Sequence, residues 1–262
     1  MKHDRFFAVS AADGSIRPER HGDGVWFADT RILSEFRILI GGAEPHPVDL
    51  HVEDGYASFE LKAGGLHVAR TRYMDGGLRE RITISNPGPG TVEEEVELAF
   101  AADFAAMLAI RGSVPELPPP VAAPSSDTPD GLLITRHDWP GQSALVIVRP
   151  VGLKRRTRLG PGKELTIFVD VIPGAIGATV SDFDEGLART KGAYPRWFDA
   201  SASIRTDNPA VNELLERSLS DLRLLCDRYP TGLYPTGGLP WYAVPFGRDQ
   251  LIASMMLLPV NP

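Results

Sequence analysis

The sequence predicts a mainly β fold: an antiparallel β-sandwich over residues 1–180, followed by helices over residues 181–262. Within the first 175 residues, short stretches with apolar residues at alternate positions are separated by glycine- and proline-rich breaks. Many short strands with regular breaks are typical of a sandwich. After residue 180 the apolar residues recur instead at spacings of three and four, which indicates helices.

Two segments show the strand period most clearly. Phe36, Ile38 and Ile40 lie at alternate positions, and two glycines follow them as a break. Residues 92–100 alternate apolar side chains with glutamates, so we expect a half-buried strand whose glutamates face solvent. Residues 86–90, Asn-Pro-Gly-Pro-Gly, predict a hairpin turn between this strand and a preceding strand at 82–85.

The rest of the predicted sandwich contains a second hairpin and a final strand. Residues 132–137 and 144–148 flank a Trp-Pro-Gly-Gln turn, and Glu164–Val171 reads as a strand closed by proline and glycine. Residues 115–130 carry six prolines, which disfavour both a helix and a paired strand. We interpret that segment as an exposed loop within the β domain; a linker between domains is the alternative.

Three helices are predicted after the sandwich. Ser181-Asp182 can cap a helix that runs toward Trp197, in a linker region of residues 181–204, with a break or kink at Pro195 near its end. Asp207-Asn208 and Pro209 can begin a second helix, with leucines spaced along residues 211–225 and an end near residues 229–230. The third helix is predicted over residues 250–258.

Composition and charge exclude several classes of protein. The chain has 262 residues, 43% hydrophobic and 23% charged, which is typical of a soluble globular protein. Its net charge of −7 argues against a nucleic-acid or anionic-membrane partner. The longest basic cluster, Lys154-Arg155-Arg156 with Arg158, is too short to reverse this and is expected on a solvated face.

Location and metal binding can be judged from the same sequence. No run approaches the roughly 18 apolar residues of a membrane span, and the N-terminus lacks the apolar stretch of a signal peptide. The single cysteine, Cys226, is expected to be buried within the second helix and is consistent with a reducing cytoplasm. The histidines show no metal-ligand spacing, so no metal site is expected.

The loop of residues 235–249 has the most unusual composition, with three aromatic residues, three prolines and three glycines. Aromatic faces can stack on the apolar surface of sugar rings. Arg248 adds a fork of hydrogen-bond donors beside the Asp249 acceptor, and sugar hydroxyls need both. The loop therefore suits a glycosyl pocket; a buried aromatic turn with a structural Arg–Asp ion pair is the alternative.

Several motifs resemble one known family. Leu239–Tyr242 with Phe246–Asp249 is similar to the PWF…FGRD segment of bacterial glycogen debranching enzymes of the amylo-α-1,6-glucosidase type. Gly24–Ser34 resembles the G-(L/V)-(Y/W)-(F/L)-x-D-T-R-x-L-S mark of that family's N-terminal domain. Residues 103–112 and Thr206–Pro209 are similar as well, although the family more often has an acidic residue at position 109.

The resemblance implies a β-sandwich packed on an (α/α)6 barrel that hydrolyses α-1,6-glucosidic branch linkages of α-glucans with inversion. Residues 205–262 would then be the first helices of an incomplete barrel. Arg248 and Asp249 match a pair that grips the terminal glucose, and Trp241 and Phe246 would shape the sugar subsite. The general acid and base are expected beyond residue 262, so no catalytic residue is assigned and the chain alone is expected to be inactive; Asp249 as the acid is an alternative.

Such an acid/base mechanism needs only carboxylates and water, so no cofactor is expected. Two other classes of function stay open: a non-catalytic glucan-binding module, and a structural domain that forms homo-oligomers through exposed barrel helices. The Asp29-Thr30-Arg31 segment is expected to form a structural salt bridge and turn, with a role at the barrel interface as the alternative.

Overall fold

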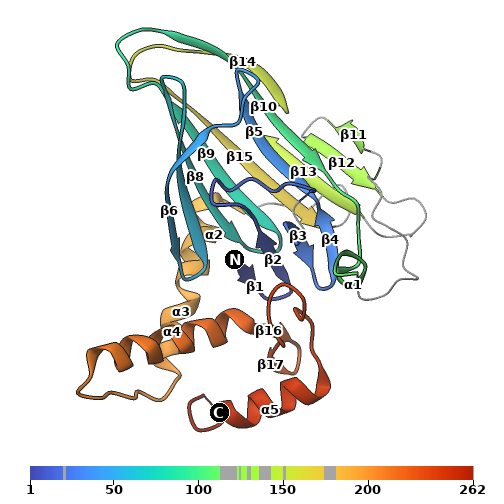
Figure 1. The fold of residues 1–262 in the computed structure, drawn as a ribbon, viewed down its shortest axis with the longest axis vertical. Helices are drawn as coiled ribbons and strands as arrows, with labels where there is room; N and C mark the ends of the chain where they lie inside the picture. Colours follow the sequence, from blue (N-terminus) through green and yellow to red (C-terminus); the bar gives the residue numbers. More distant parts are fainter. Residues whose placement is uncertain are drawn as a thin grey trace.

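The computed structural model describes residues 1–19, 22–112, 123, 125–128, 131–135, 143–149, 152–173 and 181–261. Before residue 174, antiparallel strands dominate the described chain, and the helices follow (Figure 1). The strands of this part are β1 (Lys2–His3), β2 (Phe6–Val9), β3 (Gly24–Phe27), β4 (Thr30–Leu33), β5 (Glu35–Ile40), β6 (His46–Glu53), β7 (Tyr56–Ala63), β8 (Leu66–Met74), β9 (Leu78–Ser85), β10 (Val92–Ala101), β11 (Ser125–Thr128), β12 (Gly131–Thr135), β13 (Ser143–Arg149), β14 (Lys154–Leu159) and β15 (Glu164–Pro173).

The strands form layers with one apolar core between them. A large sheet has the order β11-β12-β13-β15-β9-β8-β7-β6, and it is faced by smaller sheets of order β14-β10-β5 and β1-β2-β3-β4. Phe36 of β5 and Leu98 of β10 belong to the same buried cluster as Val68, Ile82 and Val169 of the large sheet. Alternate side chains of each strand thus enter the core, and the predicted mainly β sandwich is confirmed.

A buried charge cluster holds the chain between β2 and β3 against the large sheet. Arg70 and Arg72 of β8 each donate through Nε to Glu80 of β9, at 2.5 Å. Their terminal nitrogens donate to the carbonyl oxygens of Asp13 at 2.8 Å and Gly14 at 2.6 Å. Burial lowers the pKa of Arg72, and the Glu80 carboxylate opposes that effect.

The turn at residues 86–90 joins two sheets instead of forming a hairpin. The strands that it connects do not pair: β9 pairs with β8 and β15, and β10 pairs with β5 and β14. The Asn86 amide fixes the crossing, since it donates to the carbonyl oxygens of Gly90 at 2.7 Å and Leu159 at 2.9 Å. The hairpin prediction was wrong here because turn chemistry does not reveal which strands become partners.

The predicted solvated charges of β10 and β14 lie opposite one another. Lys154 pairs with Glu95 at 2.8 Å and Glu97 at 3.1 Å, and Arg156 pairs with Glu93 at 2.8 Å. These side chains are exposed, so the pairs contribute little to stability.

The predicted hairpin of β12 and β13 is confirmed, and its turn at residues 136–142 lies outside the described residues. In the proline-rich segment, β11 pairs with β12, so the loop prediction was wrong for residues 125–128. Those four positions contain no proline, and each can therefore donate a backbone hydrogen bond. Residues 113–122, 124 and 129–130 lie outside the described chain.

The helices after residue 180 form a helical part, most of which lies at one end of the sandwich, below the strands in Figure 1. Asp182 caps the first of its helices as predicted, accepting from the backbone of Asp184 at 2.9 Å and of Glu185 at 3.1 Å. The helices of this part are α2 (Phe183–Lys191), α3 (Ala193–Asp199), α4 (Pro209–Leu225) and α5 (Gly247–Leu257), and a hairpin of β16 (Cys226–Tyr229) and β17 (Gly232–Pro235) lies between α4 and α5. The short helix α1 (Met107–Ile110) comes earlier, after β10.

Two predicted helix boundaries were wrong by a few residues. The break after α2 falls at Gly192, and Pro195 lies in the first turn of α3 because its ring would clash with the carbonyl group four residues earlier. The cap of α4 agrees with the prediction, since the Asn208 side chain accepts from the Ala210 backbone. The helix ends at residue 225, so Cys226 is buried in β16 and not in a helix.

Helix α2 lies very close to strand β8. The Tyr73 hydroxyl donates to the Phe183 carbonyl oxygen at 2.9 Å, and burial raises the pKa of this phenol to about 12. Gly186 leaves room for that ring: a Cβ there would lie 3.1 Å from Tyr73 Cζ and closer still to the hydroxyl oxygen. A glycine within a helix here permits a contact that any larger residue would prevent.

We predict that Gly186→Ala destabilises the protein by about 1 kcal/mol or more, although alanine favours a helix by about that amount. The added methyl group must displace Tyr73, which is packed on all sides. In a Tyr73→Phe background the nearest atom is gone, so the same substitution should cost less. Denaturant unfolding of the unmodified protein, the two single variants and the double variant measures the coupling energy between the two positions. Stabilisation by Gly186→Ala in both backgrounds would contradict the prediction.

No helix among the described residues is long and apolar enough to cross a membrane.

Helix α5 exposes several large apolar side chains. On α4, Val211 and Leu214 are exposed, whereas the remaining leucines are partly buried. The exposed apolar residues at α5 are Leu251, Ile252, Met255, Met256 and Leu258.

Such a surface favours association. We therefore expect the chain to self-associate in sedimentation velocity as its concentration rises. Replacing Met255 and Met256 with glutamate should reduce the association, because charges would then have to be buried between copies. A monomer at all concentrations would show that the expectation is wrong.

Candidate functional site

The loop of residues 235–249, called the aromatic loop below, follows the β16–β17 hairpin, and this hairpin is fixed to the first strands of the sandwich. The Lys2 ammonium group is buried against the Asp227 carboxylate of β16 and also donates to the Cys226 carbonyl oxygen at 3.3 Å. Burial lowers the pKa of Lys2 and raises that of Asp227, while their mutual attraction opposes both shifts. The Arg228 backbone donates to Asp4 at 3.2 Å. These contacts set where residues 235–249 begin.

One side of the aromatic loop packs on the sandwich. Gly238 and Tyr242 exchange backbone hydrogen bonds of 3.2 and 2.9 Å, which closes a tight turn around residues 239–241. Trp241 is half-buried against a cluster that contains Phe7, Trp26 and Met107. Figure 1 shows the loop, in red, beside α1 and the first strands. Trp241 therefore points toward the sandwich.

The other side of the loop carries the remaining predicted residues, and they are exposed. Tyr242 and Phe246 are 40% and 39% exposed and meet edge to face, with 5.5 Å between ring centroids. The Arg248 and Asp249 side chains are 88% and 50% exposed, with Nε and Oδ1 3.6 Å apart. The alternative of a buried turn with an interior ion pair does not describe this arrangement.

The ion pair at the Asp29-Thr30-Arg31 segment differs from the expected one. Arg31 is buried and pairs with Asp103, which comes after β10; its Nε donates to Oδ1 at 3.1 Å. Asp29 is exposed, and its carbonyl oxygen accepts from the Met107 backbone at 2.8 Å. The expected structural salt bridge exists, but its acidic partner lies 72 positions away in the sequence.

This ion pair positions α1, and α1 brings an arginine to the aromatic loop. Arg111 follows the helix and donates through Nη1 to the Tyr242 hydroxyl at 2.6 Å, with its guanidinium carbon 5.0 Å from the ring centroid. The sequence interpretation included neither residue among the sugar-binding candidates. The signal that could have found them is that both lie in motifs already noted for the family.

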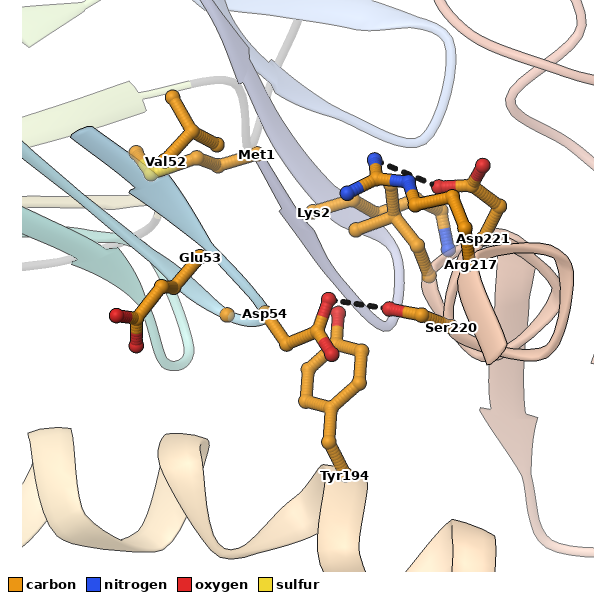
Figure 2. Close-up of a pocket in the computed structure, with 11 residues that line it drawn as sticks. Met1, Lys2, Val52, Glu53, Asp54, Tyr194, Arg217, Ser220 and Asp221 are labelled. Carbon is orange, nitrogen blue, oxygen red and sulfur yellow. Dashed lines mark hydrogen bonds and ion pairs between the residues drawn. The ribbon is translucent and has the colours of Figure 1, made fainter. Parts of the chain in front are cut away.

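A separate hollow lies on another side of the helical part. It has a volume of about 420 Å³, including open solvent, between β1, the β6–β7 turn and helices α3 and α4 (Figure 2). Two pairs of its polar side chains contact each other: Ser220 donates to Asp54, and Arg217 contacts Asp221 at 2.8 Å. Among the described residues that line it, none is a predicted sugar-binding residue.

Metal binding has no support in the described part of the chain, where no three His, Cys, Asp or Glu side chains form a group that could hold an ion.

Comparison with known families agrees with the motifs at Gly24–Ser34 and residues 103–112, whereas Thr206–Pro209 and Leu239–Asp249 lie outside the match. A sequence model for the N-terminal domain of (some) glycogen debranching enzymes matches residues 1–174. The chain belongs to this family. The family match spans both Arg31 and Asp103, so the pair that positions α1 lies within the debranching-enzyme domain.

Solved structures extend the comparison of the fold beyond the family's domain. One similar chain is described as a kojibiose phosphorylase from the human microbiome, with 10% identity and a TM-score of 0.51. The similarity covers 75% of this chain and 32% of that chain, so the debranching-family chain spans about a third of the neighbour's length. No curated protein matches the sequence.

We predict that Asp103→Asn destabilises the protein by about 3 kcal/mol, because it leaves the buried Arg31 guanidinium without an ionised partner. The matched control is Asp29→Asn, which should change the free energy of unfolding by less than about 0.5 kcal/mol because that side chain is exposed. Chemical denaturation of both variants checks the assignment. Equal losses would mean that Asp29 shares the ion pair.

Proposed function

We propose that the chain is part of a debranching-type glycoside hydrolase that acts on α-1,6-glucosidic branch linkages of α-glucans with inversion. In this proposal Arg248 and Asp249 bind the terminal hexose and Phe246 shapes its surroundings. Trp241, predicted from the sequence to shape the same subsite, packs inward on the sandwich and supports the loop instead. Membership of the debranching-enzyme family supports the class of substrate. The general acid and base are not assigned to any residue of this chain.

The exposure of Arg248 and Asp249 is the observation that carries the proposal. A guanidinium fork and a carboxylate lie side by side, 88% and 50% exposed, and Phe246, two positions before Arg248, is exposed as well. An exposed ion pair of this kind contributes little to stability, so a sugar hydroxyl can replace either partner at small cost. The hydroxyl can then accept from Arg248 and donate to Asp249.

Holding the terminal hexose would place the glycosidic bond for an inverting reaction. Such a reaction needs two carboxyl groups roughly 6.5–9.5 Å apart, with a water molecule between one of them and the sugar. The part that we assign to this chain is binding and orientation, which fix the sugar relative to those groups. Trp241, half-buried on the inner side of the loop, would support the loop from behind and report on its movement.

We predict that isomaltose binds to the chain in isothermal titration calorimetry and changes its tryptophan fluorescence. Arg248→Ala and Asp249→Asn should each raise Kd about tenfold, which corresponds to about 1.4 kcal/mol, because each removes a charged hydrogen-bond partner. If Asp249 were instead the general acid, Asp249→Asn would leave Kd unchanged.

Arg156→Ala is the control, since Arg156 is an equally exposed arginine paired with a carboxylate on the sandwich. Its Kd should equal that of the unmodified chain. Trp241→Phe identifies how much of the fluorescence change comes from the loop. The absence of both heat and fluorescence change, or an unaltered Kd in Arg248→Ala, would overturn the assignment.

A further inference from the structure

The sandwich reaches the aromatic loop through a charged side chain that the proposed function does not use. Arg111 donates to the Tyr242 hydroxyl at 2.6 Å, and its guanidinium carbon lies 5.0 Å from that ring's centroid. Both side chains are exposed although their positions differ by 131 in the sequence. A guanidinium carries five N–H donors, and the hydrogen bond to Tyr242 uses one of them.

The Arg111 side chain starts from a rigid support. Helix α1 is held at its first turn by the Asp29 carbonyl oxygen, and the backbone of Arg31 donates to the Ala105 carbonyl oxygen at 2.9 Å. Asp103 ties the same segment to the buried Arg31 guanidinium and also accepts from the Ala105 backbone at 3.2 Å. The guanidinium of Arg111 is thus presented from a fixed point, which suits a binding group more than a freely moving surface arginine.

Tyr242 connects Arg111 to the proposed hexose-binding pair. Its ring meets Phe246 edge to face at 5.5 Å. A Cβ placed on Gly237 would lie 3.0 Å from Tyr242 Cβ and 3.6 Å from Asp249 Oδ2, so the tyrosine and the aspartate border the same space beside this exposed glycine. The Tyr242 side chain therefore lies between the Arg111 guanidinium and the carboxylate of Asp249, and the Phe246 ring packs against it.

From this arrangement we infer a second hexose subsite, formed by Arg111 of the sandwich with Tyr242 and Phe246 of the loop. It takes the sugar that adjoins the terminal hexose of an α-glucan. The ring faces contact the apolar side of that sugar, and the free donors of Arg111 bind its hydroxyl groups. The inference rests on the proposed function, because the first sugar is the one that Arg248 and Asp249 hold.

The affinities for glucose, which has one sugar ring, and for isomaltose, which has two, distinguish the two subsites. Glucose should occupy only the pair at 248–249, whereas isomaltose should also reach Arg111. Arg111→Ala should therefore raise the isomaltose Kd about fivefold and leave the glucose Kd unchanged, while Arg248→Ala weakens both. NMR chemical-shift titration measures both affinities, including weak ones.

Further variants test whether the orientation and the planar guanidinium of Arg111 are needed to bind isomaltose. Tyr242→Phe keeps the ring but removes the acceptor that orients Arg111, so it should weaken isomaltose alone and by less than Arg111→Ala. Arg111→Lys keeps the charge without the planar fork and should behave like the alanine variant. The matched control is Arg5→Ala, because Arg5 is also exposed and lies 4.6 Å over the Phe27 ring. That control should bind both sugars normally.

The outcomes distinguish the inference from the function on which it rests. If the unmodified chain binds neither sugar, the proposed function fails and the second subsite fails with it. Suppose that the unmodified chain binds both sugars and that Arg248→Ala weakens the binding of both. If the Arg111 variants then bind isomaltose with normal affinity, only the second subsite is overturned. Equal losses of glucose and isomaltose in Arg111→Ala, or binding of isomaltose without glucose, would also overturn it.

Discussion

The buried ion pair between Arg31 and Asp103 is the contact on which the candidate site depends. A guanidinium inside a protein is tolerated only with a charged, hydrogen-bonded partner, so these side chains must meet once the sandwich closes. Gly24 leaves the space that the pair needs, since a Cβ there would lie 2.6 Å from Arg31 Cδ. Closing the pair fixes helix α1, and with it the position of Arg111 beside the aromatic loop.

Polar contacts of defined geometry also join the helical part to the sandwich. Arg79 of β9 is buried against Asp170 and donates through Nη2 to the Ser181 carbonyl oxygen at 2.8 Å, just before α2. Tyr73 meets α2, and Lys2 meets β16. Each contact allows one orientation, whereas apolar packing alone tolerates several. Helix α2 and strand β16 are thus fixed against the sandwich, whereas α5 leaves much apolar surface exposed.

The aromatic loop has two faces with different tasks. Trp241 and Leu239 pack inward near Trp26, and this burial holds the loop to the sandwich. Tyr242 and Phe246 point outward, where they can meet a ligand. The tight turn between Gly238 and Tyr242 produces this division, because it reverses the chain within a few residues and separates the two sets of rings. Binding and anchoring therefore occur in one short segment.

Local pattern was enough to predict the sandwich, the hairpin of β12 and β13, the Asp182 cap and the helical structure after residue 180, because strand and helix periods are properties of neighbouring residues. The motifs shared with debranching enzymes indicated the family for the same reason. Only the tertiary structure decided that β9 and β10 lie in different sheets, that Arg31 selects Asp103 over Asp29, and that Arg111 reaches Tyr242. Each of these depends on residues far apart in the sequence, and a single sequence contains no measure of which distant strands or charges become neighbours when the core closes.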